Sequence, residues 1–323
     1  MTAQPEIIFS IALDGQGGAL DVAPSGKSLR SEAKFTWSHL GLADEDVEPW
    51  LTENAELDPV VIGALLEEDT RPRSLIAEDG LLLILRGFIF NPGAEPNDLV
   101  SIRIWIDAQR AITLRHRRVA APQEVKSNLE RGTGPKNPGD LLLALSDALT
   151  ARLTLGIQQL EESADQIEEE VLSLETDDVR AQLADLRRQL ISVRRHVSPQ
   201  RDVLTRLVNA DLSWLSDQNR AQLRELANQS TRLVEELDAV RERAAISQEE
   251  LNTRISEQLN TRMYSLSIIA GIFLPLGLLT GLLGINLPGI PGAESPRAFT
   301  IFCVLLAGVG AFQLWLYRKW RWL

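Results

Sequence analysis

The chain has 323 residues, which is enough for about two domains and a sizeable hydrophobic core. Its 45 acidic residues against 33 lysines and arginines argue against a nucleic-acid-binding protein held by a basic face. A single cysteine, Cys303, excludes a disulfide framework and a cysteine-based metal cage, and the three distant histidines match no zinc-ligand spacing. The acidic residues are concentrated in the first 262 positions, because only Glu294 follows them. A domain of this charge attracts cations.

Residues 1–138 are predicted to form a mixed α/β domain. A strand is expected in EIIFSIALD at 6–14 and a helix in DPVVIGALLEE at 58–68. Two hairpins are expected, one in 74–90 that turns near 78–80 and one in 99–117 that turns near 108–109. The N-terminus lacks a basic stretch and is therefore not expected to be a secretion signal.

Residues 139–262 are predicted to be helical. No glycine occurs between Gly156 and Gly271, and Pro199 is the only proline in that stretch. Helices are expected at about 139–175, 177–197, 200–210 and from 217 onward, with a break before Pro199. Heptad-spaced apolar residues in the last helix predict a seam, covered either by this chain's own helices or by further copies. The seam consists of Leu223, Leu226, Leu233, Leu237, Val240, Ala244 and Leu251.

Two membrane-spanning helices are predicted near the C-terminal end, at 263–285 and 298–317, since both stretches are apolar and uncharged. Two such helices cannot enclose a water-filled path alone, so we favour self-assembly around an axis as the role of the seam. Arg254 and Arg262 precede the first span, and the basic tail RKWRWL follows the second. This distribution predicts an inner-membrane protein with both termini in the cytoplasm.

The first span holds Gly277 and Gly281 one turn apart, and Pro275 removes one backbone hydrogen bond in mid-membrane. Asn286 follows at the helix C-terminus, where carbonyls lack donors and the macrodipole places about half a negative charge. Several copies around an axis would present a ring of carbonyl and amide oxygens, which suits a cation that keeps its water shell. In a single copy the same residues make a plain turn after a glycine C-cap, and the residue pattern leaves both interpretations open.

Four stretches resemble the CorA metal-ion transporter superfamily. Gly284, Ile285 and Asn286 match its Gly-x-Asn signature, and MYSLSIIAGIFLPLGLLTGLLGIN is similar to its first span without a gap. RRHVSPQRDVLTRL at 194–207 and the tail RKWRWL resemble its conserved cytoplasmic helix and its C-terminus. The resemblance implies a homopentameric funnel with a cytoplasmic α/β domain, long stalk helices and two C-terminal transmembrane helices.

The resemblance also implies which residues line and close the pore. The pore side of the first span would hold Met263, Leu266, Leu274, Gly277 and Gly281. Asn286 and Gly284 would meet the hydrated metal ion at the outer mouth, with Glu294 as the only acid of the outer loop.

The loop LPGIPG after Asn286 looks like the zinc-transporting ZntB branch, because the magnesium branch usually continues with an acidic Met-Pro-Glu-Leu motif. We therefore expect zinc uptake, with or without coupling to protons, and magnesium, cobalt or nickel as alternative substrates. The spans hold no Asp, Glu, His or Lys, so selectivity has to act on a hydrated ion and no side chain relays a proton.

The expected partners are lipid, divalent cations and further copies of the chain. No bound cofactor, no nucleic acid and no enzymatic activity are expected, since the sequence offers no nucleophile paired with a base and no phosphate loop. The alternative of another class is a membrane-anchored scaffold that senses cations without transporting them.

Overall fold

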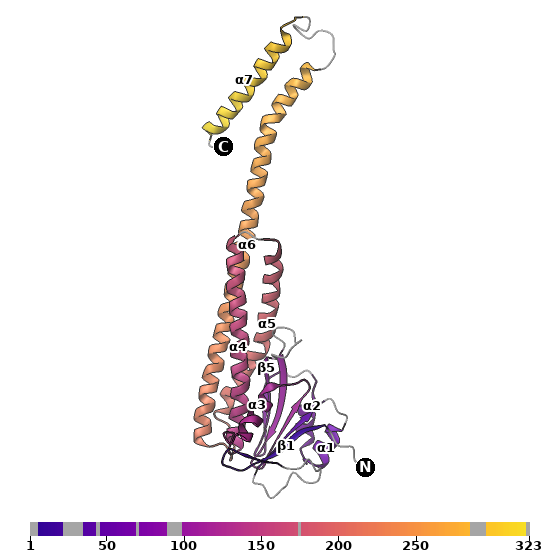
Figure 1. The fold of residues 1–323 in the computed structure, drawn as a ribbon, viewed down its shortest axis with the longest axis vertical. Helices are drawn as coiled ribbons and strands as arrows, with labels where there is room; N and C mark the ends of the chain where they lie inside the picture. The colour runs from indigo at the N-terminus through magenta and orange to yellow at the C-terminus, as the bar shows by residue number, and fades with distance from the viewer. Residues whose placement is uncertain are drawn as a thin grey trace. The chain divides into compact units, whose positions relative to one another are not determined.

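The computed structural model describes residues 6–21, 35–42, 46–68, 71–88, 99–173, 176–284 and 295–320. They form two compact units, with the boundary between Gln248 and Glu249. The first unit combines a sheet, short helices and a bundle of long helices, and the second consists of the last part of one of these helices and one further helix (Figure 1).

The first unit is built on one mixed seven-stranded sheet in the order β2-β1-β3-β7-β6-β5-β4. Every neighbouring pair is antiparallel except β3 and β7, which run parallel from Thr36 paired with Arg110 to Gly41 paired with Arg115. The two expected hairpins are confirmed, with turns at 78–79 and 107–109. The strands are β1 Ile7–Leu13, β2 Ala19–Asp21, β3 Thr36–Gly41, β4 Arg73–Ala77, β5 Gly80–Phe88, β6 Leu99–Ile106 and β7 Arg110–Arg115.

Helices cover both faces of this sheet. The short helices α1 (Val47–Glu53) and α2 (Pro59–Leu66) pack on one face, where Trp50 and Leu65 share a buried cluster with Trp105 of β6. On the other face, α3 (Ala120–Glu130) and α4 (Pro138–Ser173) bury apolar side chains against β5 and β6. The helix expected at 58–68 is α2, which begins after Asp58 because that carboxylate accepts a hydrogen bond from the Val60 amide.

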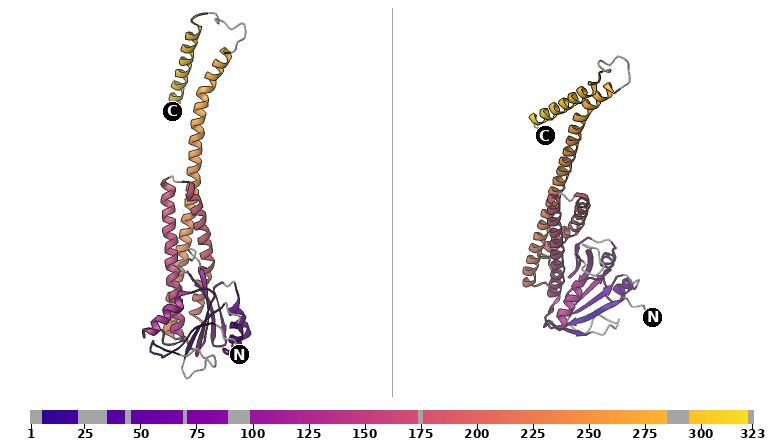
Figure 2. Two further views of the ribbon diagram at one scale, coloured as in Figure 1. Left: turned by 45° about the vertical axis from the view of Figure 1, so that its right-hand side comes forward. Right: turned by 45° about the horizontal axis from the view of Figure 1, so that its top comes forward.

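Helices α4, α5 (Thr176–Leu207) and the first part of α6 (Asp217–Leu283) lie side by side (Figure 2). Arg243 of α6 forms ion pairs with Glu161 and Asp165 of α4. The side chains of the heptad seam are almost fully buried within this single chain. The chain's own helices therefore cover the seam, and the seam gives no support to self-assembly. The buried seam residues of the first unit are Leu223, Leu226, Leu233, Leu237, Val240 and Ala244.

The break expected before Pro199 is wrong, because α5 continues through this proline to Leu207. Val197 and Val203 are buried on either side of Pro199. The buried Gln200 side chain accepts a 2.8 Å hydrogen bond from the Arg86 amide of β5. Tertiary packing and this hydrogen bond therefore hold the helix together where the local sequence favours a stop.

His39 of β3 introduces a pH-sensitive element into the sheet. It is fully buried, and its Nδ1 lies 2.8 Å from the Thr113 hydroxyl of β7. Burial, followed by the positive charge of Arg115, lowers the pKa of His39 to about 3. The unfolded chain takes up this proton near pH 6.5, so acidification from pH 6.5 toward pH 3 favours unfolding.

We therefore expect the free energy of unfolding to fall by up to about 1.4 kcal/mol per pH unit below pH 6 through His39 alone. His39→Gln removes the titrating group and keeps a side chain that can hydrogen-bond to Thr113, so its stability should depend less on pH. Chemical unfolding of both proteins between pH 7 and pH 5 measures this difference. Equal slopes would show that folding does not lower the pKa of His39.

The second unit contains the last part of α6 and the helix α7 (Ala298–Lys319), which run in opposite directions (Figure 1). Helices α6 and α7 are each long and apolar enough to cross a membrane. The predicted second span at 298–317 is therefore a helix that continues for two basic residues, Arg318 and Lys319. The predicted first span is helical up to Leu283.

Candidate ion pathway

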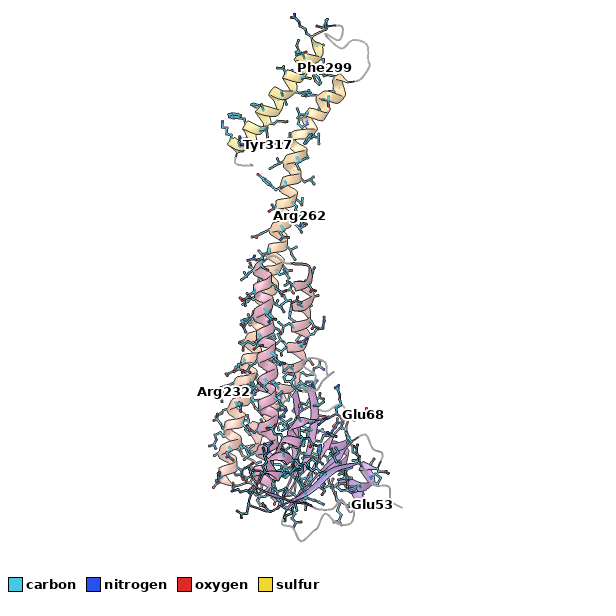
Figure 3. The ribbon with its side chains drawn as sticks, in the orientation of Figure 1. Glu53, Glu68, Arg232, Arg262, Phe299 and Tyr317 are labelled. Atoms are coloured by element: carbon cyan, nitrogen blue, oxygen red, sulfur yellow. The ribbon has the colours of Figure 1, made fainter. Side chains whose placement is uncertain are left out.

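One side of the apolar part of α6 faces α7. Here five residues of α6 are half-buried although the rest of this stretch is exposed: Ile268, Gly271, Ile272, Leu276 and Leu279. The half-buried residues of α7 recur every three to four positions and include Leu306, Gln313 and Tyr317. Figure 3 labels Tyr317 on α7, whose hydroxyl approaches the backbone of Gly271.

The opposite side of α6 carries the residues predicted to line a pore. At about 100° per residue, this set lies roughly 180° from the side that faces α7. Met263, Leu266 and Leu274 are 66%, 67% and 71% exposed. A Cβ atom added to Gly277 or Gly281 would meet nothing within 4 Å. The chain therefore brings the five predicted residues together on one face, named here the free face, and leaves that face uncovered by its own described residues.

The free face offers little strong coordination chemistry. Its side chains are apolar or absent, and nearby hydroxyl groups donate to backbone carbonyls of their own helix. Thr280 donates to the carbonyls of Leu276 and Gly277 at 3.0 Å, and Ser267 donates to Met263 at 2.8 Å. Such a surface cannot replace the water shell of a divalent cation, so an ion on this face stays hydrated.

The C-terminal end of α6 closes tightly. The Gly284 amide donates to the Thr280 carbonyl at 2.9 Å, and a Cβ atom at Gly284 would lie 2.8 Å from that carbonyl oxygen. Glycine is therefore the residue that fits this close approach. Ile285, Asn286 and Glu294 lie outside the described residues, so their predicted roles at the outer mouth stay predictions.

Within the described ranges, no group of three or more His, Cys, Asp or Glu side chains is arranged to hold a metal ion. Cys303 is exposed on α7 and belongs to none of the positions that face α6. In the described part of the chain, the free face of α6 is therefore the candidate ion pathway, and no group of side chains forms a fixed metal centre.

Sequence reasoning missed the polar contact between the two apolar helices. The Gln313 side-chain amide of α7 donates to the Gly271 carbonyl of α6 at 3.5 Å. The sequence did contain a signal for this contact. Pro275 has no N–H to donate to the carbonyl four residues earlier, at Gly271, and Gln313 is the one amide side chain in 298–317 that could replace it.

Known proteins resemble the chain over nearly its whole length. The family described as CorA-like Mg2+ transporter protein matches residues 32–319. The divalent cation transporter CmaX of Pseudomonas aeruginosa is 39% identical over 321 residues, 98% of this chain and 97% of CmaX. The zinc transport protein ZntB of Yersinia enterocolitica is 34% identical over 318 residues, 98% of this chain and 96% of ZntB.

Solved structures agree with these relationships. Full-length CmaX, at 39% identity, has a TM-score of 0.85 and covers 99% of both chains. The CorA magnesium transporter of Methanocaldococcus jannaschii is 18% identical, has a TM-score of 0.84 and covers 98% of this chain and 99% of CorA, which supports the fold. Because the family match and the relatives extend over most of the sequence, this chain belongs to the CorA-like Mg2+ transporter family.

Proposed function

We propose that this protein takes up divalent cations, with Zn2+ as its substrate, across the inner membrane through a central pore formed by several copies of the chain. The observation that carries the proposal is the uncharged free face of α6, which lies opposite the side that contacts α7. In an assembly with α7 outside, this face points to the axis.

The choice of zinc is supported by the relationship to ZntB, which is named a zinc transport protein and is 34% identical over 98% of this chain. The neutral loop LPGIPG supports it further, since the magnesium branch places an acidic motif there. Magnesium is the alternative favoured by the description of the family itself.

Self-assembly, with five copies as the family resemblance implies, is supported by an apolar stripe that precedes the membrane segment. Leu259 is 53% exposed, Ile255 is half-buried, and both continue the free face toward the N-terminal side. Apolar side chains that alternate with charged neighbours such as Arg254 and Glu257 gain stability when a partner helix covers them. Further copies of the same helix around an axis provide that cover.

The orientation follows the basic residues, with the acidic α/β unit and both termini in the cytoplasm. Cations are then drawn inward by the membrane potential, which contributes about 2.3 kcal/mol per elementary charge per 100 mV. The spans contain no Asp, Glu, His or Lys side chain that could relay a proton, so a proton-coupled mechanism would use pore water or groups at the pore ends.

Ion flux into proteoliposomes tests the proposal. The purified protein should give saturable Zn2+ uptake that exceeds uptake of Mg2+, Co2+ and Ni2+ at equal concentrations. Each ion is measured with and without a pH gradient, and empty liposomes are the control. Saturable Mg2+ uptake without Zn2+ uptake would contradict the choice of zinc, and absence of all four fluxes would favour the cation-sensing scaffold.

A further inference from the structure

The contact between Gln313 and Gly271 joins two features that are each unusual inside a membrane. Gln313 is a polar side chain in an otherwise apolar stretch of α7, and burying it in hydrocarbon is unfavourable unless it hydrogen-bonds. Pro275 lies inside α6 and has no backbone N–H.

The missing N–H of Pro275 concerns one particular carbonyl. In an α-helix, the amide of residue 275 would donate to the carbonyl of residue 271. The Gly271 carbonyl therefore lacks its normal donor, and no water is present in the hydrocarbon to replace it. Gln313 Nε2 lies 3.5 Å from this oxygen, so the side chain of α7 reaches the acceptor that the proline of α6 leaves open.

Glycine at position 271 also leaves room for a second side chain of α7, that of Tyr317. A Cβ atom there would lie 2.3 Å from the Tyr317 hydroxyl oxygen. Gln313 and Tyr317 are four residues apart and therefore lie one turn apart on the same face of α7. Both side chains approach α6 at Gly271, on the side opposite the free face.

We propose that Gln313 is a positioning residue for transport: it replaces the backbone donor lost at Pro275 and so fixes the shape of α6 between Gly271 and Gly277. Gln313 does not touch the ion. It acts on the free face from the opposite side of α6, because Leu274 and Gly277 lie three and six residues after the carbonyl to which it donates. The inference rests on the proposed function, since the fixed segment is part of the proposed pathway.

A double-mutant cycle with Pro275 tests this assignment. Gln313→Met keeps the length of the side chain and removes the donor, and it should lower the initial rate of Zn2+ uptake about threefold, the effect of an average membrane hydrogen bond. Pro275→Ala restores the backbone donor to Gly271. In that background, Gln313→Met should change the rate less than about 1.5-fold. Leu314→Met, an exposed neighbour, is the matched control and should leave the rate unchanged.

Thermal unfolding in nanodiscs gives a second cycle that does not depend on transport. It compares the native protein, Gln313→Met, Pro275→Ala and the double variant. Gln313→Met should lower the melting temperature in the native background and much less beside Pro275→Ala. Equal effects of Gln313→Met in both backgrounds would overturn the proposed contact. A loss of stability without a change in the rate per assembled protein would overturn the positioning role. If no variant and no native protein transports any ion, the proposed function fails, while the unfolding cycle still decides the contact.

Discussion

Replacing Asn286 by alanine is expected to lower the rate of ion uptake strongly while leaving the assembly intact. Asn286 comes three residues after the last residue of α6, and the substitution removes one amide oxygen from every copy around the axis. A hydrogen bond to a charged partner contributes about 1.5–3 kcal/mol, so the loss of even one effective contact lowers the uptake rate by roughly tenfold to hundredfold. Initial Zn2+ uptake into proteoliposomes measures the loss.

The adjacent substitution Leu287→Ala serves as the control, because it shortens a neighbouring apolar side chain and leaves the amide oxygens in place. Light scattering after size-exclusion chromatography checks that all three proteins form the same assembly. Unchanged uptake by Asn286→Ala would contradict a role of this residue at the pore mouth.

Gly277→Leu is expected to block uptake by filling the pathway with apolar side chains. A Cβ atom at Gly277 meets nothing within 4 Å in the single chain, so the chain itself tolerates the larger residue. Around an axis, however, every copy adds its side chain to the same constriction, and a narrow apolar constriction excludes water and hydrated ions. We expect the initial rate of uptake to fall by about tenfold or more.

Gly308→Leu is the matched control for this experiment. Gly308 lies on α7, also has nothing within 4 Å of an added Cβ atom, and is exposed away from the side that faces α6. Its replacement should leave uptake within about twofold of the native rate, since a leucine that faces lipid is favourable. Equal losses in the two variants would show that added volume disturbs membrane packing and not the pathway.

Most elements could be predicted because they are determined by local patterns. The two hairpins follow from apolar runs on either side of the turn residues Glu78–Gly80 and Ala108–Gln109. Most of α4 and α6 could be predicted because no glycine stands between Gly156 and Gly271 and Pro199 is the only proline there.

Two features could not be predicted because they depend on tertiary contacts. Pro199 favours a break, but the buried Gln200 and its valine neighbours fix α5 against β5 and override the local preference. The heptad seam of α6 indicates a packed surface but cannot say whether its partner is α4 or another copy. The structure assigns the residues from Leu223 to Ala244 to packing within the chain.

The sequence predicts that the candidate pore residues share one face of α6, but it does not predict which residues surround that face. Helical spacing places Met263, Leu274 and Gly281 on one side of α6. That this side is opposite α7 follows only from the burial of residues such as Leu276 and Leu279. The contact from Gln313 to Gly271 joins two residues that are 42 positions apart in sequence, and sequence periodicity carries no information about such a pair.

Blocking by a charged, thiol-reactive reagent tests most directly whether ions pass along the free face of α6. Single cysteines are introduced at Gly281 and Gly308 in a Cys303→Ser background, and Mg2+ or Zn2+ uptake is measured before and after reaction. We predict that the reagent stops uptake in Gly281→Cys and leaves uptake unchanged in Gly308→Cys. Full uptake after complete modification of Gly281→Cys, verified by mass spectrometry, would contradict a pathway along this face.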